Sequence, residues 1–482
     1  MPAALGIDTG GTFPDFVLVT EGGVRTHKCL STPAAPERAI RQGLAALGVD
    51  PAGLAVVHGS TVATNAVLEG KGVRTVYITN RGLGDVLTLG RQARRELYNL
   101  QPQAVAAPVP RELCLEMGGR LAADGTVIEP LTADDLASLA ARVAALAPRA
   151  VAINLLFSFR DPAMEEAIAA ALPGDLFVSR SSSVLPEYRE YERGIATWLN
   201  ASVGPLIRDH LRHLTAALPR SEIAVMHSAG GTMSAAQAAD HAVRMLLSGP
   251  AGGLAGAQYA GRLAGRHRLL TFDMGGTSTD VALVDGGVRL TSDGGIGGYP
   301  VAIPMVDVHT IGAGGGSIAR VDAGGLLQVG PQSAGADPGP ACYGRGGREA
   351  TVTDANLVLG RLAPGGLAGG AMPLDAAAAA GAVAGVARAL GVDTAAAAAG
   401  IVRLANEHMA QALRVISIQR GIDPRGFTLL SFGGAGGLHV CALAAALEMR
   451  RAMVPVHAGV LSALGMLAAP RNRHLSLTLG AP

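Results

Sequence analysis

The chain has 482 residues, a formal net charge of +1 and only 3% aromatic residues. This length predicts two or three domains, and the balanced charge argues against a nucleic-acid surface. The four cysteines form no CxxC pair, which argues against a disulfide framework or zinc knuckle and favours a reducing cytoplasm. Lysine occurs only as Lys28 and Lys71, which leaves little room for Schiff-base chemistry.

The first predicted element is a β-hairpin over residues 7–19. An apolar run delivers Asp8 to a strand end, and Gly10, Gly11 and Thr12 form the loop before a second β-type run. Glycines let backbone N–H groups approach an anion, and the threonine hydroxyl adds a donor. The carboxylate cannot bind phosphate directly, but it can hold a hydrated Mg²⁺ ion that does. The first strand starts close to Met1, so we expect no signal peptide.

Strands and helices then alternate, which predicts an α/β architecture with a largely buried sheet. The expected elements are helix 36–47, strand 56–61, helix 62–69, strand 73–79, helix 134–146 and strand 150–157. A helical stretch over 186–206 has a dense charged face, which ion pairing along the helix explains without any function. We expect this helix to cross between the two halves of the chain.

The second half repeats the first hairpin at residues 272–284. Here Asp273 is followed by Gly275, Gly276 and Thr277. Two such loops, one from each half, can grip a polyphosphate from both sides. A pair of tight hairpins without ligand is the alternative, and the duplication favours phosphate binding.

A third glycine-rich loop follows the strand predicted at 428–432. Its residues Gly433, Gly434 and Gly436 would let a base or ribose lie against the main chain. No Walker pattern is present, and no helix-opening GxGxxG lies near the start, so P-loop and Rossmann readings fail. The remaining architecture is the actin-like ATPase fold, an α/β fold of duplicated, ribonuclease H-like domains with a nucleotide cleft between them. The Ala-rich stretch 376–399 is interrupted by charges and glycines, which predicts surface helices and a soluble protein.

Further motifs make the resemblance specific. They are His58-Gly59-Ser60-Thr61, Gly90-Arg91-Gln92, Glu190-Tyr191-Glu192-Arg193, Asp273 to Asp280, Asp307 to Ser317, Ser333 to Gly344, Thr353-Asp354-Ala355-Asn356 and Phe432 to Gly436. Together they resemble the A-type subunit of the hydantoinase/oxoprolinase family, which includes the nucleotide-binding subunits of acetone and acetophenone carboxylases. The motifs extend over nearly the whole chain.

The resemblance implies that ATP phosphorylates an amide or carbonyl oxygen, chiefly through positioning and charge neutralisation. Asp8 and Asp273 would hold Mg²⁺ or Mn²⁺. The residues that would cradle phosphates are Gly10, Gly11, Thr12, Gly275, Gly276 and Thr277, and those that would support adenosine are Gly433, Gly434 and Gly436. A hydantoin, 5-oxoproline or similar lactam would be the substrate, and a B-type subunit the partner in a cytoplasmic hetero-oligomer. A ketone carboxylase subunit and a non-catalytic nucleotide-binding module remain alternatives.

The chain departs from the family pattern at three places. Pro14 replaces a threonine of the first loop, and Gly437 replaces a proline after the third. We expect an N-terminal domain at 1–185, a second domain at 186–470 and a short tail at 471–482, without the C-terminal domain usual in the family.

Four further side chains are candidate catalytic groups. Asp15 and Asp280 lie seven residues after the first aspartate of each hairpin, where turn hydrogen bonding and catalysis are both open readings. Asp307 and His309 alternate on an extended segment beside a glycine run, so both side chains share one face. That spacing suits a metal or an acid–base pair facing the cleft, although a buried structural histidine fits as well. His58 could touch phosphate or stabilise a turn.

Overall fold

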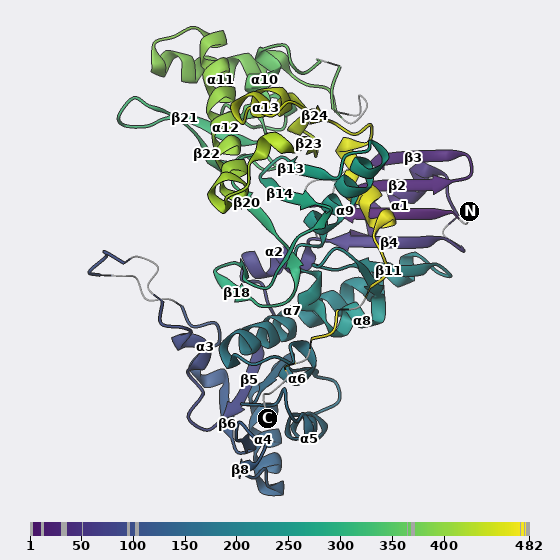
Figure 1. The fold of residues 1–482 in the computed structure, drawn as a ribbon, viewed down its shortest axis with the longest axis vertical. Coiled ribbons are helices and arrows are strands. Elements are labelled where there is room, and N and C mark those ends of the chain that lie inside the picture. Colours follow the sequence, from purple (N-terminus) through teal and green to yellow (C-terminus); the bar gives the residue numbers. More distant parts are fainter. Residues whose placement is uncertain are drawn as a thin grey trace.

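A computed structural model of the chain describes residues 3–10, 14–29, 36–50, 52–93, 97–101, 106–363, 365–367, 372–472, 474–476 and 478. Three sheets organise the described residues (Figure 1). Two six-stranded sheets form the upper part of the molecule, and a four-stranded sheet lies in a separate lower domain.

The first sheet contains the first hairpin. Its strand order is β12 (Thr232–Ser234), β11 (Glu222–Met226), β4 (Ala55–Ser60), β1 (Ala4–Thr9), β2 (Pro14–Thr20) and β3 (Gly23–Lys28). Strands β1, β4 and β11 are parallel, whereas β2 and β3 run antiparallel. Alternate residues such as Leu5 and Ile7 enter the main core, because side chains alternate across a strand. Helix α1 (Pro36–Leu47) forms as predicted and contributes Ile40 to that core.

The second sheet repeats this arrangement. Its order is β15 (Gly287–Val288), β14 (Thr279–Asp285), β13 (Arg268–Met274), β23 (Thr428–Phe432) and β24 (Ala452–Met453), and β20 (Val308–Ile311) pairs with β14. Strands β13, β23 and β24 are parallel, and β14 and β15 are antiparallel. The helices α10 (Val352–Val358), α11 (Ala376–Leu390), α12 (Thr394–Ile416) and α13 (Val440–Ala446) contribute to the core on one face. The predicted α/β duplication is confirmed.

Two helices join the sheets. Helix α9 (Ser248–Leu263) packs against β13, and α14 (Leu461–Ala468) packs against β1 and closely against α9. A Cβ at Gly465 would lie 2.0 Å from the carbonyl oxygen of Gly252, so glycine permits this close approach. The two hairpins therefore flank one helical layer (Figure 1).

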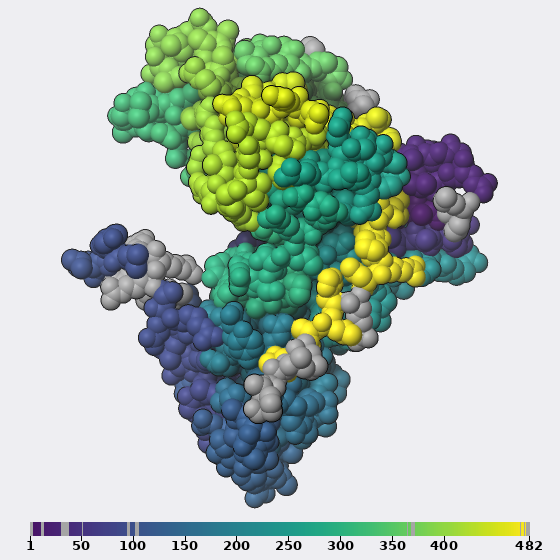
Figure 2. Space-filling view, in the orientation of Figure 1, coloured from purple at the N-terminus to yellow at the C-terminus, as the bar shows by residue number. Residues whose placement is uncertain are grey.

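The lower domain has four parallel strands in the order β10 (Phe177–Arg180), β9 (Ala150–Asn154), β5 (Thr75–Asn80) and β6 (Cys114–Met117). Helix α7 (Glu190–Ala217) leads from it back to β11 of the first sheet, rather than between the two duplicated halves as expected. Since β11 and β12 complete the first sheet, this sheet contains strands from both sides of the domain boundary that we expected at residue 185. Figure 2 shows a broad hollow between the lower domain and the upper part.

Shorter elements connect these layers. They are α2 (Val62–Leu68), α3 (Val86–Leu89), β7 (Arg120–Leu121), β8 (Val127–Glu129), α4 (Ala133–Leu146), α5 (Ala163–Ala171), α6 (Ser181–Val184), α8 (Ala235–Asp240), β16 (Leu290–Thr291), β17 (Gly294–Ile296), β18 (Tyr299–Val301), β19 (Met305–Val306), β21 (Ser317–Val321) and β22 (Leu327–Ser333). Among the described residues, no single helix has the length and hydropathy needed to cross a membrane, and only the bent pair α11 and α12 reaches them jointly.

Candidate functional site

Each hairpin presents two carboxylates side by side. Asp8 in β1 lies directly opposite Asp15 in β2, and Asp273 in β13 lies directly opposite Asp280 in β14. Directly opposed residues of antiparallel strands project from the same face of the sheet. The seven-residue spacing seen in the sequence is therefore the geometry of a tight hairpin that pairs its two acids.

Electrostatics indicate that the two pairs lie close to each other, and we call them the four-carboxylate cluster. Burial, together with the negative charges of Asp280, Asp8 and Asp15, raises the pKa of Asp273 to about 8, against the opposing effect of Lys28. Burial and the charge of Asp15 raise the pKa of Asp8 to about 7, against the opposing effect of Lys28. Asp8 and Asp15 of the first half thus raise the pKa of Asp273 in the second half.

Two neighbours stabilise the outer acids of the cluster. Burial raises the pKa of Asp15 to about 6, and the ion pair that Lys28 forms with this carboxylate limits the increase. The hydroxyl of Thr310 donates a hydrogen bond of 2.6 Å to Asp280 and opposes the burial that raises the pKa of that carboxyl. The cluster therefore has more carboxyl groups than its one paired lysine can neutralise, and a bound cation would favour their ionised forms.

Asp8 has an unsatisfied oxygen that such a cation could use. Its Oδ1 atom is buried and has no hydrogen-bond partner among the described residues. A Cβ at Gly249, at the start of α9, would lie 3.7 Å from this oxygen. In the part of the chain that the structure describes, no three His, Cys, Asp or Glu side chains are arranged to bind a metal unaided. Magnesium usually keeps several waters and is held by one or two carboxylates with substrate phosphates, so the donor set fits that ion.

The third glycine loop, residues 433–437, lies against the second hairpin. Gly433 has φ of +80°, and a Cβ there would lie 2.2 Å from Oδ1 of Asp273. Glycine is therefore required both by the backbone conformation and by the adjacent carboxylate. A Cβ at Gly436 would meet Ser431 at 2.4 Å, whereas Gly434 faces open space.

The phosphate-binding loops are described unequally. Gly275 is half-buried, and Gly276 and Thr277 are exposed at the second loop. The backbone N–H of Gly316 donates a 2.7 Å hydrogen bond to the carbonyl of Gly276, so the glycine run after β20 supports this loop. Gly10 follows β1 in the first loop. Gly11 and Thr12 lie outside the described residues.

The register does not bring Asp307 and His309 to the four-carboxylate cluster. His309 lies opposite Val281, one position away from the Asp280–Thr310 pair, and neighbouring residues of a strand project from opposite faces. Asp307 forms an ion pair with Arg420, just beyond α12. Sequence alternation did not reveal which face of the sheet they occupy, and their expected position beside the phosphates is not supported.

Other sequence candidates have structural partners. His58 is fully buried, and its Nε2 lies 2.9 Å from Nε2 of His210, which favours the structural reading. Glu190 and Glu192 pair with Arg91 rather than along their own helix. Arg193 is buried, and its bonds include Asn154 at 3.1 Å, Ser181 at 3.2 Å and the carbonyl of Leu155 at 2.8 Å.

Sequence reasoning missed Lys28 and Thr310. Lys28 lies opposite Asp15 at the end of β3, so the tight turn at Gly22 and Gly23, which joins β2 to β3, could have identified it. Thr310 pairs with Asp280 across β20 and β14, strands separated by about thirty residues. That pairing has no local sequence signal.

The duplicated sheets, the acid pairs at their hairpins and the shared helical layer define an actin-like ATPase fold. Residues 4–173 match the family model described as the hydantoinase/oxoprolinase N-terminal region, and residues 193–474 match the one described as hydantoinase/oxoprolinase. The chain belongs to the hydantoinase/oxoprolinase family, as its motifs predicted.

Individual relatives agree with this assignment. The chain is 39% identical to the caprolactamase alpha subunit of Pseudomonas jessenii, over 96% of this chain and 70% of that protein. The crystal structure of the ATP-dependent caprolactamase from that organism superposes with a TM-score of 0.84 at 38% identity, covering 96% of this chain and 70% of that one. The acetophenone carboxylase gamma subunit of Aromatoleum aromaticum is 34% identical, over 96% of this chain and 67% of that protein.

Proposed function

We propose that this chain is the ATP-binding subunit of an ATP-dependent cyclic amide hydrolase, which phosphorylates the amide oxygen before the ring opens. The observation that carries the proposal is the four-carboxylate cluster, with its unpartnered oxygen on Asp8. The similarity to a caprolactamase subunit supports the choice of a lactam, with hydantoin and 5-oxoproline in the same chemical class.

In this proposal Asp8 and Asp273 would hold Mg²⁺ or Mn²⁺. Bound there, the ion would supply neutralising charge for the phosphates. Backbone N–H groups around Gly10, Gly11, Thr12, Gly275, Gly276 and Thr277 bind the phosphate oxygens. Gly433, Gly434 and Gly436 form the surface for adenosine, and Gly433 sets the distance between that surface and Asp273.

The reaction forms a bond between the amide oxygen and the terminal phosphorus while the bond to the ADP oxygen breaks. An amide oxygen becomes a better nucleophile as the amide N–H loses its proton. Asp15 is suited to accept that proton, because a pKa of about 6 leaves it ionised near neutral pH while still basic. Lys28 orients Asp15, and Thr310 orients Asp280, which is placed to order water around the cation.

A B-type partner subunit completes the enzyme in this proposal. The relatives named above are themselves named as subunits, and the described part of this chain offers no metal-ligand cluster for a second reaction centre. The purified chain alone should therefore open lactam rings poorly, and efficient ring opening by it would refute this point. All four cysteines are free, which supports the cytoplasm as the location.

A ketone carboxylase subunit is the second candidate, favoured by the 34% identity to the acetophenone carboxylase gamma subunit. An enolate oxygen would then take the place of the amide oxygen at the same phosphorus. Turnover of ATP with lactams and hydantoins, compared with ketones and bicarbonate, in the presence of the partner subunit, separates the two functions.

Calorimetric titration with Mg²⁺ and ATP tests the site itself. The variants Asp8→Ala and Asp273→Ala should lose metal-dependent nucleotide binding, whereas the exposed control Asp293→Ala in the same half as Asp273 should bind as wild type does. Titration curves of both site variants that match wild type would refute the proposed metal and nucleotide site.

A further inference from the structure

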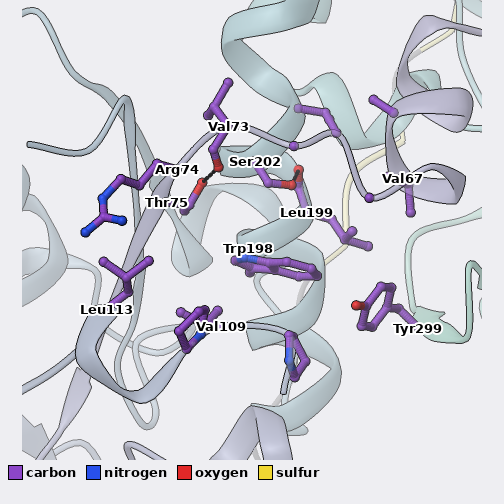
Figure 3. A pocket seen from close by; sticks show the side chains of 16 residues that line it. Val67, Val73, Arg74, Thr75, Val109, Leu113, Trp198, Leu199, Ser202 and Tyr299 are labelled. Atoms are coloured by element: carbon purple, nitrogen blue, oxygen red, sulfur yellow. Dashed lines mark hydrogen bonds between the residues drawn. The ribbon is translucent and has the colours of Figure 1, made fainter. Parts of the chain in front are cut away.

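A cavity away from the four-carboxylate cluster lies at the junction of three parts of the molecule (Figure 3). It has a volume of about 390 Å³, within the range of about 300–1,000 Å³ typical of small-molecule sites. Its walls come from α2, from α7, from the start of β5 with the segment before Leu113, and from the β17–β18 hairpin of the second half. We call it the ring pocket.

The walls of the ring pocket are mostly apolar. Trp198 of α7 and Tyr299 of β18 meet edge to face, with ring centroids 5.1 Å apart. The aliphatic lining side chains include Val67, Val73, Val109, Leu113 and Leu199. Burying an apolar ring against such walls is favourable by about 25 cal/mol for each Å² removed from water.

The polar groups of the ring pocket are few and mostly uncharged. Ser202 donates its hydroxyl proton to the carbonyl of Leu199 at 3.0 Å, and Thr75 donates its own to the carbonyl of Val73 at 2.8 Å. Each hydroxyl has one proton, so both oxygens can only accept a further hydrogen bond from a ligand.

Donors are available nearby. The indole N–H of Trp198 can only donate, and the hydroxyl of Tyr299, which points toward Trp198 in Figure 3, can donate or accept. Arg74 is the one charged side chain among the described lining residues; it is exposed, and its Nε already donates to the carbonyl of Leu146 at 3.1 Å. An apolar ring with one N–H and one C=O complements this arrangement, whereas a zwitterion does not.

We propose that the ring pocket binds a small neutral ring amide at a site separate from the phosphoryl-transfer centre. The choice of ligand class rests on the proposed function. The lining of the pocket begins at Ala66 and Val67, beyond the first turn of α2, and continues past the end of α2 to Gly70 and Gly72. The first phosphate hairpin precedes the start of α2 in the chain. None of the described lining residues belongs to the four-carboxylate cluster or to the three glycine-rich loops, and α2 rises about 6 Å from Val62 before the lining begins at Ala66.

The pocket is also connected to the four-carboxylate cluster. From Tyr299 the chain continues through β19 to β20, where Thr310 donates to Asp280. A ligand that fixes Tyr299 therefore acts on the segment that orients this acid. The ring pocket is thus a second site for a substrate-like ligand.

Tryptophan fluorescence tests the proposal directly, because Trp198 is the only tryptophan of the chain. Titration of the full chain with ε-caprolactam should give a saturable change in emission. Its charged, ring-opened form 6-aminohexanoate should bind at least tenfold more weakly, and so should cycloheptanone, which lacks the N–H. A change that does not saturate, or that is equal for the three compounds, would overturn the proposal.

Two variants of α2 form a matched pair. Val67→Phe fills the ring pocket and should abolish the emission change, while Leu68→Phe, at a side chain that is 60% exposed and outside the lining, should retain it. Circular dichroism confirms that both are folded. If Val67→Phe proves unfolded, Ser202→Ala replaces it, with at least tenfold weaker binding expected. Equal affinity in the filled or Ser202→Ala variant and in wild type would overturn the site.

The same titration on Asp273→Ala separates this inference from the proposed function. Lactam binding at the ring pocket should persist in that variant although nucleotide binding is lost. If wild type turns over ATP but shows no saturable lactam signal, the ring pocket is refuted and the proposed function is not. If it shows the signal but turns over no ATP with lactams in the presence of the partner subunit, the proposed function is refuted and the ring pocket is not.

Discussion

Replacing Asp273 by Asn should stabilise the protein at alkaline pH while removing metal-dependent nucleotide binding. The pKa of Asp273 is raised from 3.8 to about 8 by burial and by three neighbouring acids. An unfolded chain ionises this carboxyl near pH 4, and the folded chain resists doing so until about pH 8. Stability therefore falls as pH rises through this window, because the folded state binds the additional proton.

The size of the effect follows from the same values. A pKa unit corresponds to about 1.4 kcal/mol, so the ionised carboxylate disfavours the folded state by at most about 6 kcal/mol above pH 8. Water and the neighbouring acids share part of this, and we expect Asp273→Asn to gain about 2 kcal/mol at pH 8.5 and far less at pH 5. The melting temperature should rise by about 4–8 °C at pH 8.5.

Differential scanning fluorimetry at both pH values, without metal or nucleotide, measures this difference. Asp293→Asn serves as the exposed control and should change the melting temperature little at either pH. Two results would refute the reasoning: a lower melting temperature for Asp273→Asn at pH 8.5, or Mg²⁺-dependent ATP binding equal to that of wild type.

Three further substitutions test a loop of the site, a buried arginine of the lower domain and the rejected acid–base histidine. Gly433→Ala combines a φ of +80° with a Cβ 2.2 Å from the carboxylate of Asp273. We expect stability to be lower by at least about 1–2 kcal/mol in a denaturant titration, and nucleotide binding to be weaker. Wild-type stability and binding would show that the loop can move. Arg193→Met leaves Asn154 and backbone carbonyls without their buried donor, so unfolding should become easier by about 3–5 kcal/mol, whereas a neutral result would mean that water replaces the guanidinium. His309→Ala should keep ATP turnover within about threefold of wild type, because His309 lies on the face opposite Asp280; a loss of about 10²-fold or more would restore the acid–base role.

The duplication and the identity of the loops were accessible from sequence for a local reason. A β-hairpin is set by its alternating apolar residues and its turn, so the pairing of Asp8 with Asp15 is contained within eight residues. The same holds for Asp273 and Asp280. Glycine at 433 likewise follows from a backbone conformation that other residues disfavour.

Which face of a sheet a residue occupies, and what covers it, depended on the tertiary structure. The alternation of Asp307 and His309 predicted a shared face, but only the pairing of β20 with β14 showed that this face is on the α12 side. The same pairing lets the hydroxyl of Thr310 donate a hydrogen bond to Asp280. The charged start of α7 could be read as a solvated helix, yet Arg91 lies a hundred positions earlier in the chain. Burial and Asp280 raise the pKa of Asp273 most, but the further effect of Asp8 and Asp15 on it requires α9 and α14 to bring two distant hairpins together, and no local pattern encodes that proximity.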